Sequence, residues 1–187
     1  MTVRPRLTTA KVVDAALELI DEQGVDGLTL AAVAARTGVA TPSLYKHVAS
    51  LAELRGHVGV RVLEEMTDRF TQTVLGLSGD QAVEALMRAY RAYVTENPKR
   101  YAAMPMDPLH DELQQAAGQK LVEVMLATLR GYGLEGSAAI HATRRLRVIV
   151  HGFASIESGG GFGLPEGLDD TYDQLVRMYL TDLRGQS

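Results

Sequence analysis

The chain has 187 residues, of which 46% are hydrophobic and 22% are charged, and its formal net charge at pH 7 is −4. This length and composition are typical of one or two globular domains and exclude a largely disordered protein. The absence of cysteine excludes disulfide bonds and thiolate chemistry and is typical of a reducing compartment. Without an apolar run of signal-peptide or membrane-spanning length, we expect a cytoplasmic protein.

Apolar residues recur with helical spacing almost everywhere, and the first fifty residues predict three helices. The first covers about 9–23 and is followed by a glycine suited to end it. Thr29 is placed to cap a second helix, which Gly38 ends because glycine reaches the left-handed conformation without strain. Pro42 fits the first turn of a short third helix that runs to about Val48.

The rest of the sequence also predicts helices and no strands, which gives an all-α fold with about nine helices. Ser50 and Glu53 form a capping box that opens a long fourth helix toward Leu75. A glycine-rich segment is expected to connect the last two helices. The later helices are expected from a break at 77–80 to Asn97 and over 99–104, 110–132, 137–158 and 168–183.

Residues 29–57, TLAAVAARTGVATPSLYKHVASLAELRGH, predict a helix-turn-helix. Ala34 places a small side chain where two helices must cross closely, just before the turn glycine. Val39, Leu44 and Val48 would pack the short third helix onto the other two. Its remaining side chains are polar, and a short polar helix on an apolar scaffold is typical of an element that reads the major groove of DNA.

Charge is distributed unevenly along this region. Residues 1–60 contain equal numbers of basic and acidic side chains, so the net −4 belongs to the remainder of the chain. The acidic residues cluster over 14–22. Local charge decides where a phosphate backbone docks, and the basic residues that flank the third helix are Arg4, Arg6, Lys11 and Lys46.

With these motifs, residues 9–57 resemble the N-terminal pattern of the tetracycline-repressor-like (TetR) family of bacterial transcriptional regulators. The resemblance implies a helix-turn-helix DNA-binding domain over 1–50 and a helical ligand-binding and dimerisation domain over 51–187. It further implies a homodimer that binds a palindromic DNA operator, and repression that a small molecule relieves.

Individual roles follow from the same resemblance. Alternatively, the Tyr45 ring packs on the first helix, His47 caps a helix end, and the arginines of the N-terminal arm are ordinary solvated residues. The residues that match DNA-contacting positions of the family are Thr29, Thr41, Pro42, Ser43, Tyr45, Lys46 and His47, with Arg4 and Arg6 as a mobile arm.

The sequence departs from the family pattern at two positions. Many relatives have a lysine at the start of the fourth helix, where this chain has Leu51. Some have an arginine early in the second helix, where this chain has Ala31. Each change removes a phosphate contact, so we expect a modest nonspecific affinity and a flatter salt dependence.

The segment 150–157, VHGFASIE, resembles a C-terminal domain of the same family that is named for a tryptophan-histidine-glycine motif, with Val150 at the tryptophan position. The resemblance implies that the helices over 137–158 and 168–183 pair with their copies in a second subunit. Their apolar pattern predicts more hydrophobic surface than one small subunit can bury. The residues concerned are Ile140, Leu146, Ile149, Val150, Phe153, Ile156, Leu168, Tyr172, Leu175, Val176, Tyr179 and Leu183.

A pocket for a small apolar or amphipathic effector is expected between the fourth and eighth helices. Each candidate is alternatively an ordinary core residue. The candidate lining residues are Tyr90, Tyr93, Tyr101, Met104, Met125, His141 and His151, of which His151 would be the polar anchor.

Catalysis is not predicted, and neither a cofactor nor a metal is expected. Segment 159–163 lacks the lysine and the preceding strand of a phosphate-binding loop, and the adjacent side chains of 110–112 would diverge on a helix. The main alternative is a constitutive or architectural DNA-binding regulator without a ligand. A cavity of several hundred Å³ would favour the ligand-responsive regulator.

Overall fold

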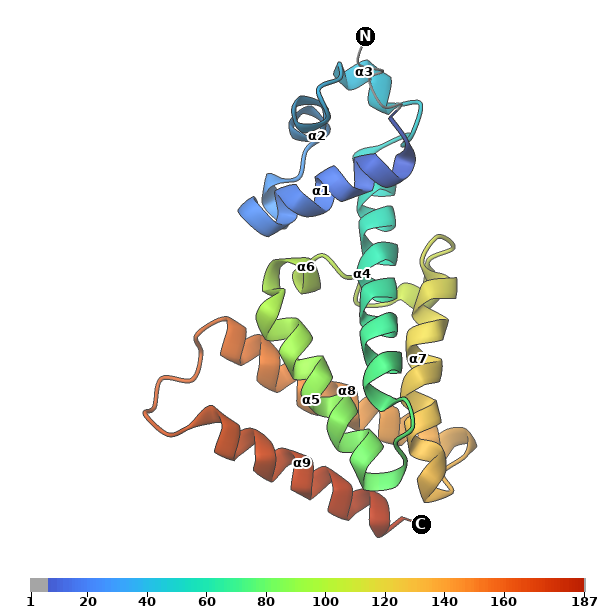
Figure 1. Ribbon diagram of the computed structural model, residues 1–187, viewed down its shortest axis with the longest axis vertical. Coiled ribbons are helices and arrows are strands. Elements are labelled where there is room, and N and C mark those ends of the chain that lie inside the picture. Colours follow the sequence, from blue (N-terminus) through green and yellow to red (C-terminus); the bar gives the residue numbers. More distant parts are fainter. Residues whose placement is uncertain (1–6, 187) are drawn as a thin grey trace. The chain divides into compact units, whose positions relative to one another are not determined.

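The structure is a computed structural model that describes residues 7–186, and all regular structure in this part of the chain is helical (Figure 1). The α-helices are connected by short loops and three 3₁₀ turns. The elements are α1 Thr9–Gln23, η1 Val25–Gly27, α2 Leu30–Thr37, α3 Thr41–Leu44, α4 Leu51–Val74, α5 Gly79–Glu96, α6 Pro98–Ala102, η2 Pro108–His110, α7 Gln115–Leu129, η3 Arg130–Tyr132, α8 Gly136–Ser158 and α9 Leu168–Arg184.

These elements form two compact units, and the chain passes between them more than once. The first unit contains residues up to Leu63 together with Lys99–Gly118, and the second contains Glu64–Pro98 and the residues from Gln119 onward. Packing therefore places α6 and the loop before α7 with the N-terminal helices. The division into domains at residue 50 remains a prediction, since packing units and functional domains need not coincide.

Local signals specify several helix ends as expected. Thr29 caps α2, because its side-chain oxygen accepts a hydrogen bond from the Ala32 backbone N–H at 3.1 Å. Gly38 ends α2 with φ of 68°. At the start of α4, the Ser50 hydroxyl accepts from the Glu53 N–H at 3.1 Å, and the Glu53 carboxylate accepts in return from the Ala49 N–H.

Two predicted helix limits are wrong. The α-helical part of α3 ends at Leu44 rather than at Val48, and the chain continues as turns in which the His47 and Val48 N–H groups both donate to the Leu44 carbonyl. Helix α7 begins at Gln115 rather than near residue 110. The delay has a local cause, since the Asp111 carboxylate accepts from two backbone N–H groups and fixes a turn before the helix.

The reading head of the first unit, which we define as α1 to α3, is built on a small apolar core. Helix α2 contacts both α1 and α3. Ile20, Leu28, Val33, Leu44 and Val48 are each no more than 1% exposed. A Leu-to-Ala change in such a core costs about 2–5 kcal/mol. Leu44, the buried residue of the short α3, is therefore essential for holding this helix in position.

In the second unit, α5 packs against both α8 and α9, and Figure 1 shows these three helices side by side. Two buried tyrosines of α9 connect this helix to α5 and to α8. The Tyr172 hydroxyl donates to the Met87 carbonyl at 2.6 Å, and the Tyr179 hydroxyl donates to the Ala142 carbonyl at 2.9 Å. Burial raises the pKa of both phenols above its ordinary value, so both remain protonated donors.

Candidate nucleic-acid interface

Helix α3 buries one side chain and presents polar ones to solvent. Leu44 is fully buried, whereas Pro42, Tyr45 and Lys46 are exposed. The flanking Thr41, Ser43 and His47 are half-buried. The short helix and the turn after it thus carry several hydrogen-bonding side chains that the buried Leu44 holds in place, which is the composition a groove-reading element requires.

Tyr45 and His47 each have an alternative structural interpretation, as a packing residue and as a helix cap. Tyr45 is 56% exposed, so more than half of its surface is accessible to solvent. The His47 carbonyl accepts a hydrogen bond from the Thr9 hydroxyl at 3.4 Å, which ties the end of the α3 segment to the start of α1. The DNA-contacting roles of both residues remain predictions.

Thr29 lies at the amino end of α2, the helix that contacts α3. Its side-chain oxygen caps the helix and its residue is exposed. Because the first N–H groups of a helix lack internal partners, this end attracts anions. The structure thus leaves Thr29 accessible at a helix end suited to a phosphate.

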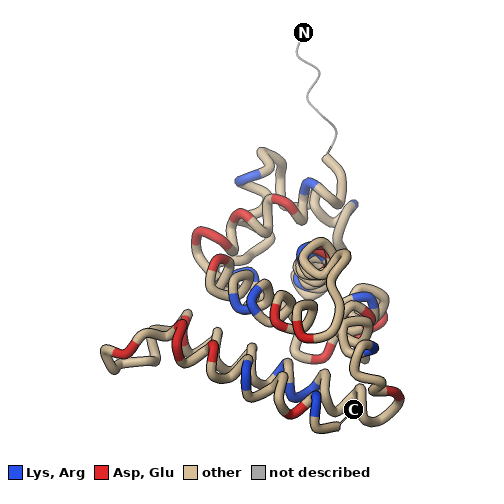
Figure 2. The backbone as a smooth tube through the Cα atoms, turned by 60° about the horizontal axis from the view of Figure 1, so that its bottom comes forward, with Lys and Arg blue, Asp and Glu red and all other residues tan. Residues whose placement is uncertain are grey.

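The acidic cluster of α1 is neutralised within the first unit. Figure 2 shows several acidic residues along this helix. Asp14 pairs with Arg61 at 2.9 Å and Asp21 pairs with Arg100 at 2.7 Å. Glu22, like Glu18, pairs with Arg36, and this contact lowers the pKa of the Glu22 carboxyl. Unpaired negative charge on α1 is therefore reduced beside the reading head.

Of the basic residues expected near α3, Lys46 is described by the structure, whereas two arginines are not. No ion pair involves Lys46 within residues 7–186, so its ammonium group is available for a phosphate. Arg4 and Arg6, the predicted arm, lie outside the described residues. The two departures from the family pattern are surface positions, since Ala31 is exposed and Leu51 is half-buried.

The apolar surface predicted for α8 and α9 is largely buried within the chain. Leu146, Val150, Tyr172 and Leu183 have exposed fractions of 0%, because α5 and the facing helix cover them. The expectation that the whole set lacks partners is therefore wrong. Of the predicted set, Ile140 and Ile156 on α8 are among the exposed large apolar residues. Val148 on α8 and Met178 on α9 are also exposed, although the prediction did not include them.

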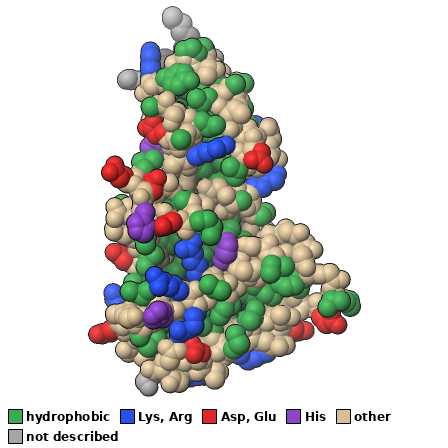
Figure 3. Space-filling model, turned by 180° about the vertical axis from the view of Figure 1, so that it is seen from behind, with side chains coloured by type: hydrophobic (Ala, Val, Ile, Leu, Met, Phe, Trp, Pro, Cys, Tyr) green, Lys and Arg blue, Asp and Glu red, His purple; other side chains and the backbone are tan. Residues whose placement is uncertain are grey.

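This exposed face also carries positive charge. His141 and Arg144 are exposed on α8, and Figure 3 shows basic (lysine or arginine) and histidine side chains among hydrophobic ones on the lower part of the rear view. His151 is half-buried on the same helix, and burial together with the positive charge of Arg147 lowers its pKa. His151 is therefore largely neutral near pH 7.

The predicted effector residues do not form one group. Tyr90, Tyr93 and Met125 are buried in the second unit, where the Tyr90 ring lies 5.3 Å from that of Phe70 and the Tyr93 hydroxyl donates to Glu65. Tyr101 and Met104 belong to the first unit, and His141 is a surface residue. The lining role of all seven remains a prediction.

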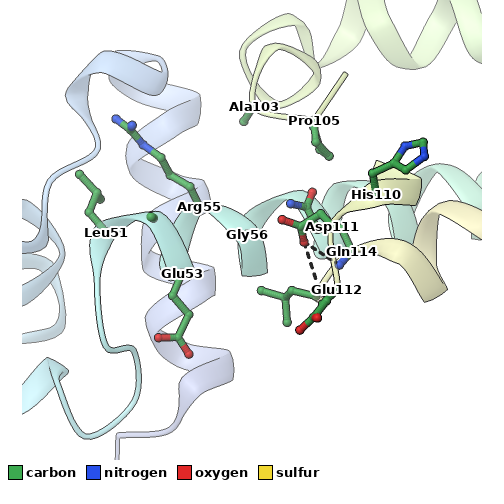
Figure 4. Close-up of a pocket in the computed structure, with 12 residues that line it drawn as sticks. Leu51, Glu53, Arg55, Gly56, Ala103, Pro105, His110, Asp111, Glu112 and Gln114 are labelled. Carbon is green, nitrogen blue, oxygen red and sulfur yellow. Dashed lines mark hydrogen bonds between the residues drawn. The ribbon is translucent and has the colours of Figure 1, made fainter. Parts of the chain in front are cut away.

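Among the predicted residues, His141 lines a surface groove of about 510 Å³ on α8, and further grooves of ligand size occur away from all seven. One groove has a volume of about 760 Å³ and lies in the first unit between the start of α4 and residues 103–114 (Figure 4). A second, of about 370 Å³, lies in the second unit beside the end of α4 and contains Thr71 and Gly131. Sequence patterns missed both, although Gly56 and Gly59 inside α4 were a usable signal, because glycine within a helix is costly and indicates close packing.

Two segments with possible chemical roles are structural. The chain at 159–163 is a connector, in which the Gly161 N–H donates to the Ile156 carbonyl and Phe162 packs 4.9 Å from Phe153. Residues 110–112 hold no metal-type cluster, and none occurs among the described residues. No helix in the described part of the chain is long and apolar enough to cross a membrane.

Comparison with known proteins gives matches to both parts of the chain. Residues 12–57 match the family model for bacterial regulatory proteins of the tetR family, and residues 83–179 match that for the tetracyclin repressor-like C-terminal domain. The chain is 34% identical over 185 residues to the uncharacterized HTH-type transcriptional regulator YobS of Bacillus subtilis (strain 168), covering 98% of this chain and 96% of that protein.

A second relative and a solved structure agree with this similarity. An uncharacterized HTH-type transcriptional regulator of Mycobacterium tuberculosis is 35% identical over 157 residues, covering 83% of this chain and 72% of that protein. The crystal structure of TetR-Q116A from Acinetobacter baumannii AYE in complex with minocycline superposes with a TM-score of 0.72 at 21% identity, covering 97% of this chain and 99% of that one. At this identity, the superposition supports a common fold.

Proposed function

This chain belongs to the tetR family of bacterial DNA-binding transcriptional regulators, and on that premise we propose that it is a homodimeric repressor. It binds a palindromic operator in the bacterial cytoplasm, where the chromosome lies, and a small-molecule effector releases it. Its relatives are named as transcriptional regulators, in agreement with a role that requires no catalysis.

The observation that carries the DNA-binding part is the arrangement of α3. A buried Leu44 fixes a helix with an exposed Pro42, and the turn that directly follows the helix exposes Tyr45 and Lys46. Hydroxyl groups and the lysine can donate to bases and phosphates, and the proline ring can contact a thymine methyl group. Thr29 supplies a further phosphate contact from the capped end of α2.

Dimerisation is supported by the geometry of DNA and by the exposed face of α8. One short helix reads only a few base pairs, whereas two reading helices about 34–36 Å apart read a palindrome. Val148, which is 71% exposed, and Met178, which is 57% exposed, are apolar groups that a second copy would cover. We infer a two-fold interface formed by α8 and α9.

An effector is supported by the grooves and by the family. The same fold was solved for a TetR variant in complex with minocycline. The constitutive regulator without a ligand is the second candidate. The groove of about 760 Å³ beside the start of α4 is open to solvent and offers room for an effector. In our proposal, the effector changes the spacing of the reading heads through its differential affinity for two conformations.

The central experiment titrates the protein with DNA that flanks its own gene, at two salt concentrations. Tyr45→Ala and Lys46→Ala are expected to bind more weakly, and Lys46→Ala should reduce the salt slope by about one unit. Lys120→Ala, an exposed lysine of α7, is the matched control. Equal, salt-insensitive binding by all four proteins would exclude α3 as the recognition element.

A further inference from the structure

The large apolar residues that α8 exposes all lie on one row of this helix. They are Ile140, Val148 and Ile156, which follow one another at intervals of eight residues. Because side chains at positions i and i+4 are neighbours on a helix surface, the three belong to one row, with Arg144 and Gly152 between them. Helix α8 therefore presents a ridge, which we define as residues 140, 144, 148, 152 and 156, on the side away from its buried residues.

Nothing in the described part of the subunit requires a glycine at position 152. A Cβ atom built there would have no contact within 4 Å beyond its own helical turn, and φ is not positive. Glycine inside a helix is destabilising relative to alanine, because it loses more conformational freedom on folding. Its place in the middle of the ridge is explained if the backbone of another molecule approaches α8 here.

A groove of about 510 Å³ runs beside the ridge on the same helix. Arg144 and Val148, which belong to the ridge, form one of its sides. The other side is the next row of α8, formed by His141, Arg145 and Ile149. Where two helices cross, the ridge of one fits into a groove of this kind on the other. Helix α8 thus carries a ridge and a groove that can receive it.

This combination fits a second copy of the same chain. In a two-fold dimer the contact is self-complementary, so each contact between two different residues occurs twice. Val148 and Ile156 lie four residues before and four residues after Gly152. A two-fold axis beside Gly152 therefore brings Val148 of each subunit opposite the partner's Ile156 when the two helices are antiparallel.

Charge favours the antiparallel direction over the parallel one. In a parallel crossing, the exposed Arg144 would lie opposite the partner's Arg144, and like charges repel each other. In an antiparallel crossing, the same arginine is directed toward the carboxyl end of the partner's α8. The carbonyl groups at that end of a helix carry partial negative charge and attract a cation.

We propose that α8 crosses the α8 of a second subunit at Gly152 in an antiparallel contact, with Ile156 of each subunit seated in the groove beside the partner's Val148. This inference rests on the homodimer of the proposed function and specifies where its two-fold axis lies. Two ridges of this type cross at about −50°, with helix axes about 8–10 Å apart. Gly152 allows the axes to approach to the short end of that range.

One substitution should have opposite effects on the dimer and on the monomer. Gly152→Leu places a branched side chain at the crossing point and should raise the dimer dissociation constant at least about tenfold, as measured by sedimentation of the full chain. In the Val148→Glu background, where the chain is expected to be monomeric, the same substitution should raise Tm by about 2 °C, because leucine is a better helix former than glycine. Ala138→Leu, at an exposed position in the first turn of α8, is the control and should leave the dimer unchanged.

Cysteine cross-linking tests the register of the crossing. The chain has no cysteine, so an introduced cysteine is its only thiol. A mixture of the Val148→Cys and Ile156→Cys proteins, allowed to exchange subunits and then oxidised, should form disulfide-linked dimers at least about tenfold faster than either protein alone. In either protein alone the two thiol positions are about 12 Å apart along the helix, beyond the Cα separation of about 7 Å that a disulfide tolerates.

The matched control for cross-linking is a mixture of the Ile140→Cys and Ile156→Cys proteins. In the proposed register these two positions are also about 12 Å apart along the helix. This mixture should therefore cross-link no faster than the single proteins.

The outcomes separate this inference from the proposed function. If the wild type dimerises but Gly152→Leu dimerises as well as Ala138→Leu, or if the single cysteine proteins cross-link as fast as the first mixture, the crossing is wrong and the homodimeric regulator stands. A fall in Tm for Gly152→Leu in the Val148→Glu background would show that the subunit itself needs this glycine, and it would equally overturn the crossing.

Two further outcomes concern the proposed function itself. A wild type that sediments as a monomer at all concentrations refutes the homodimer and the crossing together. If the cross-links form as expected but the wild-type dimer does not bind the DNA that flanks its gene, the proposed function fails and the crossing stands.

Discussion

Arg91 of α5 and Glu157 of α8 form a two-bonded ion pair at the end of the loop that connects α8 to α9. The Arg91 Nε and Nη2 atoms donate to the two Glu157 carboxylate oxygens at 2.7 and 2.6 Å, and Arg91 Nη1 donates to Asp169 at 2.8 Å. The guanidinium carbon also lies 5.1 and 4.7 Å from the ring centroids of Phe153 and Tyr172. One residue thus connects three helices.

Arg91→Met is expected to lower the free energy of unfolding by about 3 kcal/mol, because removal of one partner leaves the other charge unpaired in a largely buried place. The side chains of Arg91 and Glu157 are only 14% and 19% exposed. Arg88→Met is the matched control, since its side chain is 46% exposed, and it should cost no more than about 1 kcal/mol. Urea denaturation measures both, and equal losses would contradict the role of Arg91.

The two functions of Thr29 can be separated by substitution. Thr29→Ala should cost about 1 kcal/mol of stability through loss of the α2 cap, together with a loss of operator affinity. Thr29→Asp should keep stability near the wild-type value, because aspartate caps well, and should still weaken DNA binding through repulsion of the phosphate. Unfolding and fluorescence anisotropy on the same samples check this. Operator binding by Thr29→Asp at wild-type strength would refute the phosphate contact.

A missing phosphate contact should be restorable at Ala31. This position is exposed at the start of α2, so Ala31→Arg is expected to raise DNA affinity and steepen the dependence of log K on log salt by about 0.9. Ala116→Arg, at an exposed position of α7, adds the same charge elsewhere and should leave the slope nearly unchanged. If the salt dependence of DNA binding has the same slope in both variants, position 31 does not lie beside the DNA phosphate backbone.

The proposed dimer face predicts a specific disruption. Val148→Glu places a carboxylate in the centre of the expected interface and should raise the dimer dissociation constant by at least about tenfold. Leu75→Glu, at a residue that is 80% exposed after the end of α4, should leave the dimer intact. Sedimentation at several concentrations distinguishes them, and a Val148→Glu protein that remains as dimeric as the control would rule out this face.

His151 predicts a pH dependence of stability. Its pKa in the folded protein is lowered by burial and by Arg147, so the unfolded chain takes up the proton more readily. Its contribution to stability is therefore present above the unfolded pKa of about 6.5 and is lost as pH falls through the lower folded pKa. We expect Tm to fall between about pH 7.5 and about pH 5.5, and to fall less in His151→Asn.

The control for this prediction is His141→Asn, which removes an exposed histidine from the same helix. Its Tm should follow the wild-type curve over the same pH range. If His151→Asn and the wild type lose the same stability on acidification, another group accounts for the effect.

The helix ends that depend on neighbouring residues could be predicted from sequence. Helix α1 occupies the predicted range, Thr29 caps α2, and Gly38 ends it with a positive φ. Each of these features depends on a contact between residues that are close in the sequence. The local sequence is therefore sufficient to predict these helix ends. The family follows for the same reason, since the reading head is a short continuous segment.

The limits of α3 and α7 could not be predicted as well. Periodicity extended α3 to Val48, because Val48 is apolar and is indeed buried. The Val48 side chain, however, can be buried from a turn as well as from a helix. In the same way, the sequence of 110–114 predicts the start of a helix. In the structure, the Asp111 carboxylate accepts hydrogen bonds from two backbone N–H groups and holds this segment in a turn.

The sequence by itself determined the helical class, the reading head and the polar residues of α3, because these depend on local periodicity, caps and turn residues. Only the tertiary structure decided which apolar residues of α8 remain exposed, that Arg91 pairs with Glu157, and that Gln114 lies unpartnered against Gly59. These relationships join residues far apart in the chain. Their energies depend on packing and burial, which a one-dimensional pattern does not specify.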